Sequence, residues 1–129
     1  MKFVLFTIIS MTLSFTAFGS IDKITDSDHT LLLELLNQRA QAEVADKTCD
    51  SDEQCKFVGF GSKPCGGSWT YLIYSELTTN TERFSNLVEI YNSLDAENNI
   101  RIGLFSDCAL ALPPKVACDK VSNSCVAQR

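Results

Sequence analysis

Residues 56–75 read KFVGFGSKPCGGSWTYLIYS and predict a β-hairpin. The two ends of this stretch, residues 56–60 and 69–75, are rich in the aromatic and β-branched side chains that favour strands. The residues between them are mostly glycine, serine and proline, which form turns. Large side chains alternate onto both faces of the second strand: Trp69, Tyr71 and Ile73 on one face, Leu72 and Tyr74 on the other. We therefore expect other parts of the chain to cover both faces of the hairpin.

Helices are predicted before and after this hairpin. The first runs over about residues 28–45, where Asp26 and Ser27 supply capping oxygens just before it. In the second, Thr79 is followed three residues later by Glu82, a capping-box pattern, and the helix continues to about residue 97. The apolar residues that recur at helical spacing in the first helix are expected to pack on a sheet: Leu32, Leu35, Leu36, Ala40 and Val44.

The end of the chain predicts a second hairpin. Residues 100–114 read as irregular, and Pro113 and Pro114 favour an extended approach to strands at 115–119 and 124–127. The predicted fold class is therefore α+β: a small antiparallel sheet of about four short strands, packed with two helices and crosslinked by disulfides.

The six cysteines indicate three disulfides, because an even number of cysteines in a short exported chain most simply forms closed bridges. They are Cys49, Cys55, Cys65, Cys108, Cys118 and Cys125. Six cysteines allow about 15 connectivities. If the terminal strands pair in the obvious register, Cys118 lies opposite Cys125, which favours a bridge between them. Bridges Cys65–Cys108 and Cys49–Cys55 would complete the set. No close pair of the C-x2-C type is present, so we expect neither a metal nor a cofactor.

The first 19 residues predict an export signal. Lys2 precedes the uncharged apolar run of residues 3–18, and the small residues Ala17 and Gly19 have the spacing that signal peptidase accepts. We expect cleavage after Gly19, which leaves residues 20–129 as a single disulfide-rich extracytoplasmic domain, secreted or periplasmic and free of the membrane. An uncleaved anchor is the alternative, although the apolar run is short for a membrane span.

Charge argues against nucleic acid as a partner. The chain has 11 Lys and Arg against 16 Asp and Glu, a net charge of −5, whereas binding to phosphates needs clustered basic residues. Catalysis also lacks a recognisable motif. The only histidine, His29, falls in the first turn of the predicted first helix, and a solvent-exposed polar residue is common there. We therefore assign no catalytic residue.

Residues 59–69 are the best candidate for a binding surface. They do not match the phosphate-loop pattern, because Lys63 follows Gly61 and Ser62 in the wrong order. Pro64 and a bridge at Cys65 would instead hold the backbone rigid, which reduces the entropy lost on binding. The candidate binding residues are Lys63, Pro64, Gly66, Gly67, Ser68 and Trp69.

Two sites in the sequence could present a side chain to a protease. Lys63 could enter a pocket specific for basic residues, with Pro64 making the next bond resistant to cleavage, although inhibitors usually present a bond that the protease can engage. Leu112 before Pro113 is the second site. The simpler interpretation is that the glycines and Pro64 only turn the chain between two strands.

These observations predict an exported, non-catalytic domain that binds a protein partner, with inhibition of an exported hydrolase or protease as its specific form. Two alternatives remain. The first is a small secreted or envelope hydrolase. The second is a module that binds sugar or peptide on Trp69 and Tyr71, although aromatic residues alternating along a strand more often belong to the core.

Overall fold

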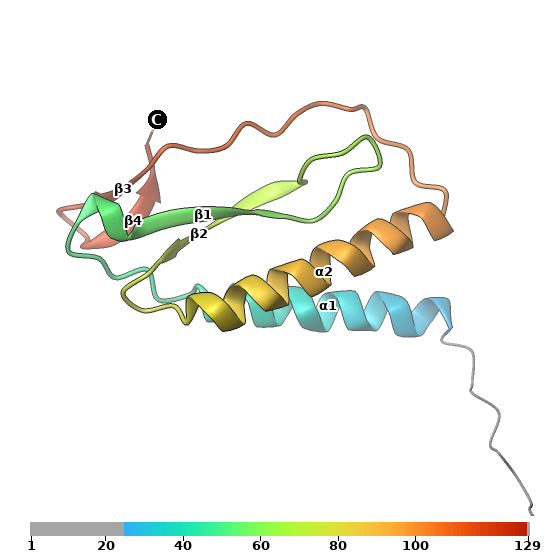
Figure 1. Cartoon of the computed structure of the whole chain (residues 1–129), viewed down its shortest axis with the longest axis horizontal. Helices are drawn as coiled ribbons and strands as arrows, with labels where there is room; N and C mark the ends of the chain where they lie inside the picture. Colours follow the sequence, from blue (N-terminus) through green and yellow to red (C-terminus); the bar gives the residue numbers. More distant parts are fainter. Residues whose placement is uncertain (1–24, 129) are drawn as a thin grey trace, which may run out of the picture.

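A computed structural model describes residues 25–128 and shows the predicted α+β fold (Figure 1). In chain order the elements are α1 (Asp26–Glu43), a short 3-10 turn (Asp52–Gln54), β1 (Cys55–Phe60), β2 (Thr70–Ser75), α2 (Thr81–Arg101), β3 (Val116–Asp119) and β4 (Ser124–Ala127). Within the described residues, no helix has the length and apolar character needed to cross a membrane. The predicted signal segment, its cleavage site after Gly19 and residues 20–24 and 129 lie outside the described part of the chain.

The four strands form two hairpins instead of one sheet. β1 and β2 pair antiparallel, from Cys55 opposite Ser75 to Phe60 opposite Thr70. β3 and β4 pair separately, in a register that places Cys118 opposite Cys125, as the sequence predicts. The loop between β1 and β2, residues 61–69, is called the glycine loop below.

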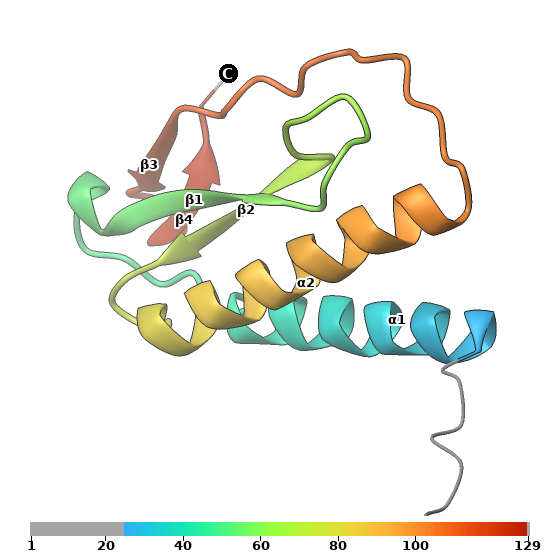
Figure 2. The ribbon, with the colours of Figure 1, turned by 45° about the vertical axis from the view of Figure 1, so that its right-hand side comes forward.

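The two helices run antiparallel and cover one face of the β1–β2 hairpin (Figures 1 and 2). Phe60 of β1 stacks on Tyr91 of α2, with 4.1 Å between the ring centroids. The buried residues of this core come from both helices and both strands: Ala40, Val44, Phe60, Leu72, Phe84 and Val88. The other face of the hairpin is also covered, because Ile73 of β2 packs against a second cluster made of cysteines.

The apolar face predicted for the first helix is only partly buried. Ala40 and Val44 are in the core, but Leu32 and Leu35 are exposed, as is Leu31. The reason is that α1 packs mainly on α2 and reaches the hairpin only near its C-terminal end, where Ala40 and Val44 lie. The buried stripe is therefore narrower than the leucine content suggests.

The start of α2 differs from the predicted capping box. Asn80, and not Thr79, caps the helix: its side-chain oxygen accepts the backbone N–H of Arg83 at 3.0 Å. Thr79 is buried, and its backbone N–H bonds to Ser75 instead. Either residue has a capping oxygen, so only the path of the chain between β2 and α2 decides which one caps the helix.

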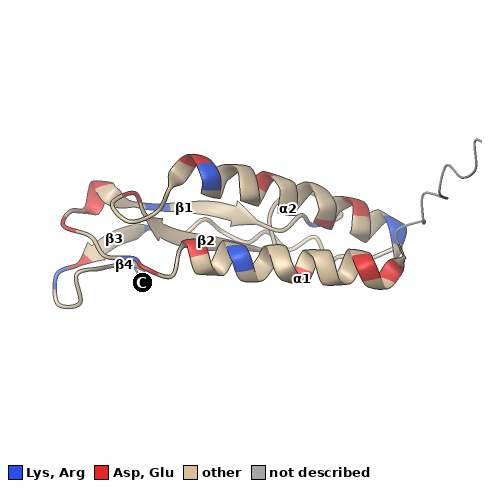
Figure 3. Cartoon of the chain, turned by 90° about the horizontal axis from the view of Figure 1, so that it is seen from below, with Lys and Arg blue, Asp and Glu red and all other residues tan. Residues whose placement is uncertain are grey.

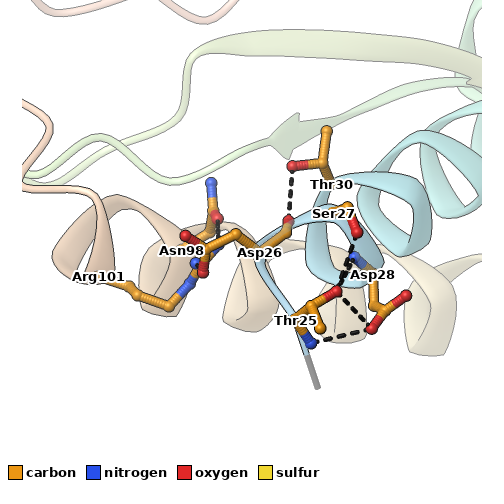
Figure 4. A network of polar contacts seen from close by, with 7 residues as sticks. All are labelled: Thr25, Asp26, Ser27, Asp28, Thr30, Asn98 and Arg101. Atoms are coloured by element: carbon orange, nitrogen blue, oxygen red, sulfur yellow. Dashed lines mark hydrogen bonds and ion pairs between the residues drawn. The ribbon is translucent and has the colours of Figure 1, made fainter. Parts of the chain in front are cut away.

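The free ends of the two helices are tied together (Figure 4). Thr25 caps α1 through a reciprocal pair of hydrogen bonds with Asp28, whose carboxylate accepts the Thr25 backbone N–H at 2.9 Å. The Thr25 hydroxyl also donates to this carboxylate and holds the pKa of Asp28 below its usual range. Arg101, in the last turn of α2, pairs with Asp26 and donates to Asn98 at 2.6 Å.

Two buried disulfides attach the β3–β4 hairpin to the rest of the domain, and their pairing differs from the prediction. The bonds are Cys49–Cys118 and Cys55–Cys125, so the predicted pairs Cys118–Cys125 and Cys49–Cys55 are wrong. Cys118 and Cys125 do lie opposite each other, but each bonds outside its own hairpin: Cys118 to Cys49, in the segment between α1 and β1, and Cys125 to Cys55, at the start of β1. The third predicted bond, Cys65–Cys108, is confirmed. Three disulfides in so small a domain indicate an oxidising, extracytoplasmic environment.

The cysteine core has the spacing of a metal site without its chemistry. The sulfur atoms of Cys49, Cys55 and Cys118 lie within 4.8 Å of one another. All three belong to disulfides, however, and metal binding by cysteine requires the thiolate.

The difference in burial predicts an order of reduction. Cys65 and Cys108 are exposed, whereas the four core cysteines are buried, and exchange with a thiol requires access to a sulfur atom. Mild dithiothreitol treatment of the native protein should therefore open Cys65–Cys108 first. Alkylation followed by peptide mass mapping would detect this order. Labelling of the core cysteines at the same rate would contradict it.

Glu43 predicts an acid-sensitive contact between the helices. Arg83 donates to its carboxylate at 2.6 Å and Arg39 lies 3.3 Å away, and the Arg83 bond chiefly lowers the pKa of Glu43 from its usual 4.5. A lowered folded-state pKa means that this stabilisation is complete above pH 4.5 and is lost as the pH falls through the folded-state value. The melting temperature of wild type should fall on acidification, and that of Glu43→Gln should fall less over the same pH range. An unchanged pH profile would show that the pair contributes nothing.

Candidate functional site

An extended segment crosses the hairpin on the side away from the helices (Figures 1 and 2). It comprises residues 104–113, called the strap below, and connects the end of α2 to β3. α2 ends at Arg101, and Gly103, two residues later, reverses the chain with a positive φ of 64°. The N–H of Leu104 bonds back to the carbonyl oxygen of Asn99 at 2.9 Å. The irregular character predicted for this region is confirmed from Ile102 onward.

The strap is fastened to the hairpin at three points. The disulfide Cys65–Cys108 joins it to the glycine loop. One residue further, the Lys63 ammonium donates to the carbonyl oxygen of Ala109. The Tyr71 hydroxyl then donates to the carbonyl oxygen of Ala111 at 3.0 Å. The strap therefore lacks strand pairing and is nevertheless held in one path.

The strap exposes large apolar side chains. The exposed fractions are 95% for Phe105, 76% for Leu110 and 82% for Leu112. Isolated exposed apolar residues are normal on protein surfaces, but several together on one segment mark an interaction site. The strap thus carries three highly exposed apolar side chains close together in the chain.

A row of polar side chains on α2 forms hydrogen bonds with the backbone of the glycine loop. Asn92 accepts the N–H of Gly61 at 2.7 Å, Asp95 accepts the N–H of Ser62 at 2.7 Å, and Asn99 donates to the carbonyl of Ser62 at 2.6 Å. These three residues are three and four positions apart and so lie on one helix face. Together with Cys65–Cys108, this polar row gives the loop the rigidity that the sequence predicts.

Asp95 joins both ends of the glycine loop. The same carboxylate oxygen that accepts the N–H of Ser62 also accepts the indole N–H of Trp69 at 3.1 Å. Asp95 is buried, and burial of a carboxylate is tolerated only where hydrogen bonds satisfy it. Position 61 requires glycine for Trp69 to pack this closely, because a Cβ atom at that position would lie 2.4 Å from Trp69 Cδ1.

Lys63 does not fit the role predicted for it. Its side chain is 10% exposed, and its ammonium bonds to Ala109, lies 4.0 Å from the Asp107 carboxylate and sits 5.2 Å from the centre of the Trp69 ring. Entry into a protease pocket would break all of these contacts. Lys63 therefore holds the strap in place. The sequence did not show this, because Asp107 and Ala109 lie far away in the chain and Trp69 lies at the other end of the glycine loop.

The other predicted binding residues form a turn beside the strap. Pro64 is exposed and occupies the second position of a turn that the Gly66 N–H closes by bonding to Lys63 at 2.9 Å. Gly66 and Gly67 are exposed and have the positive φ values that glycine permits, as predicted. Ser68 is half-buried.

Trp69, which is 39% exposed, and Tyr71, the pair considered for a sugar or peptide, both have polar partners within the domain. The indole N–H of Trp69 is used by Asp95 and the Lys63 ammonium lies near its ring. Tyr71 is half-buried, packs edge-on against Phe57 and bonds to the strap through its hydroxyl. Tyr71 therefore supports the strap directly, and Trp69 lies beside Lys63, which bonds to the strap.

The structure adds residues to the candidate site that the sequence analysis missed. Leu112 was a sequence candidate, whereas Phe105 and Leu110 were not. Their signal was the segment LFSDCALALPP at 104–114, in which apolar residues recur without strand or helix periodicity. Such a pattern does not reveal whether the side chains point inward or outward.

No catalytic arrangement is seen within residues 25–128. The His29 ring makes no hydrogen bond or ion pair with any of these residues. A shallow pocket on the outer side of α2 is lined by Glu89, Ile90, Ser93 and Leu94, and it brings together no base and nucleophile. Comparison with protein-family models, curated proteins and solved structures finds no match to this chain.

Asp95→Ala should loosen the glycine loop and the strap above it. Loss of hydrogen bonds to a buried charged acceptor typically costs about 2 kcal/mol, and we expect a decrease of this size in the free energy of unfolding. Asp95→Asn, which keeps one oxygen acceptor, should lose less. Urea titration followed by the fluorescence of Trp69, the single tryptophan, would measure both. Equal stability of wild type and Asp95→Ala would contradict the assigned role.

Proposed function

We propose that this chain is an exported, non-catalytic domain that binds a protein partner through the strap and inhibits an exported hydrolase. One observation carries this proposal: Phe105, Leu110 and Leu112 are exposed on a segment whose path is fixed. Burying a leucine side chain contributes about 1.5 to 3 kcal/mol, so an apolar cleft of a partner would gain substantially from this surface.

Rigidity supports binding as the purpose of this surface. A flexible segment loses conformational freedom when it binds, and this loss reduces affinity. In the strap, the bonds from Lys63 and Tyr71 and the disulfide at Cys108 limit this freedom before the partner arrives. Pre-ordered surfaces of this kind change little between the free and bound states, as is common among protease inhibitors.

The proposed location agrees with the chemistry of the chain. The disulfides require an oxidising compartment, and the N-terminal segment has the pattern of a removable export signal. Acidic residues are spread along both helices (Figure 3), and the net charge is −5. A polyanion such as nucleic acid is therefore not the proposed partner.

Charges placed on the strap should abolish binding. The oxidised protein without its leader would be immobilised and exposed to culture supernatant and envelope fractions of the source organism. The variant Leu110→Asp/Leu112→Asp would be treated in the same way. Any partner captured from these fractions would then be assayed for hydrolytic activity, with and without the wild-type domain added in solution. We expect the strap variant to lose the bound hydrolase and its inhibition.

A matched control is available on α1, where Leu31 and Leu35 are also exposed. Leu31→Asp/Leu35→Asp makes the same two replacements, with the same change of charge, and should retain binding. Circular dichroism would confirm that both variants fold. Loss of the hydrolase in the α1 variant together with retention in the strap variant would refute the strap as the binding surface.

A further inference from the structure

Leu110 occupies the best-held position of the strap. The carbonyls on either side of it, those of Ala109 and Ala111, both bond to the body of the protein through Lys63 and Tyr71. The residue before Ala109 is Cys108, which is covalently fixed. Phe105 and Leu112 lie outside this pair of anchors. Leu110 is therefore the exposed apolar side chain with the most restricted backbone.

The anchors also determine which way the Leu110 backbone faces. In an extended chain, backbone groups repeat their direction every second residue. Because the carbonyls of Ala109 and Ala111 accept bonds from the hairpin and its loop, an extended backbone over residues 109–111 would direct the carbonyl of Leu110 away from the hairpin. Its side chain is 76% exposed, and the neighbouring glycine, Gly67, places no side chain beside it. The Leu110 side chain is thus accessible to a partner, and such a backbone would present its carbonyl to the same partner.

A cleft that binds extended peptides needs this combination. Endopeptidases bind the backbone of a substrate and insert one side chain into a pocket that sets specificity. We infer that the partner is an endopeptidase with an apolar primary pocket, and that Leu110 enters this pocket and places the Leu110–Ala111 bond at the catalytic centre. This inference rests on the proposed function and gives it a partner class and a specificity residue.

Competing positions fit less well. Lys63 is covered by its contacts with the strap and Trp69. Leu112 is exposed, but Pro113 and Pro114 follow it, and neither has a backbone N–H to donate to a protease. Phe105 has no anchored carbonyl on either side among the contacts of the strap.

The crosslinks explain how such a bond would inhibit instead of being consumed. Hydrolysis of Leu110–Ala111 would add one water molecule and give a carboxylate on Leu110 and an ammonium on Ala111. The first end would stay attached through Cys65–Cys108, and the second through the bridges of Cys118 and Cys125 to the hairpin. Because neither end can diffuse away, the reverse reaction is favoured and the cleft stays occupied.

The test is an exchange of specificity. Inhibition of chymotrypsin and subtilisin, which accept apolar side chains, and of trypsin, which accepts basic ones, would be measured with oxidised wild-type protein, Leu110→Lys and the matched control Leu112→Lys. We expect wild type to inhibit the apolar-specific enzymes. Leu110→Lys should weaken that inhibition by about 30-fold or more, as for a central interface residue, and should gain inhibition of trypsin. Leu112→Lys should change either inhibition far less.

A second readout is independent of affinity. After long incubation with a catalytic amount of chymotrypsin, non-reducing mass spectrometry should find a gain of one water, and reduction should locate the cut after Leu110. The assignment of Leu110 would be overturned if Leu112→Lys changed inhibition more than Leu110→Lys did. It would also be overturned if chymotrypsin cut the strap at another bond. If wild type inhibits none of these enzymes, the endopeptidase assignment fails, while the strap-dependent capture of a hydrolase described above still decides the proposed function.

Discussion

The two buried disulfides are the constraint on which the rest of this fold depends. The β3–β4 hairpin shares no ladder with β1–β2. Cys55–Cys125 connects the two hairpins, and Cys49–Cys118 connects β3 to the segment between α1 and β1. Each bridge closes a loop of about 70 residues, for which chain entropy gives a stabilisation of about 4 kcal/mol. The two loops overlap almost completely, so these contributions are not additive. By fixing where β3 begins, the bridges fix one end of the strap.

The other end of the strap depends on α2. The same helix that supplies Phe84 and Val88 to the core presents Asn92, Asp95 and Asn99 to the glycine loop. Its C-terminal turn then releases the chain into the strap. One element thus orients the core, the loop and the exposed segment, which explains how a small domain can hold an apolar surface open to solvent.

The elements near in sequence were predictable. Strands, helices and the irregular segment follow from alternation, helical spacing and turn residues, and the predicted register of β3 and β4 is confirmed because a short hairpin leaves few alternatives. The errors arose where a residue chooses between partners. Cys118 could bond to Cys125 or across to Cys49, and Thr79 or Asn80 could cap α2. Local pattern contains no information on that choice.

The sequence by itself determined the composition of the site: a lysine, a proline and glycines at a turn, and leucines followed by two prolines further along. Only the tertiary structure decided their roles. Lys63 is folded onto the strap and Leu110 projects from it, because the partners of Lys63 at Asp107 and Ala109 lie more than 40 residues later in the chain. Exposure is a property of what packs around a side chain, and that is fixed by contacts between distant segments.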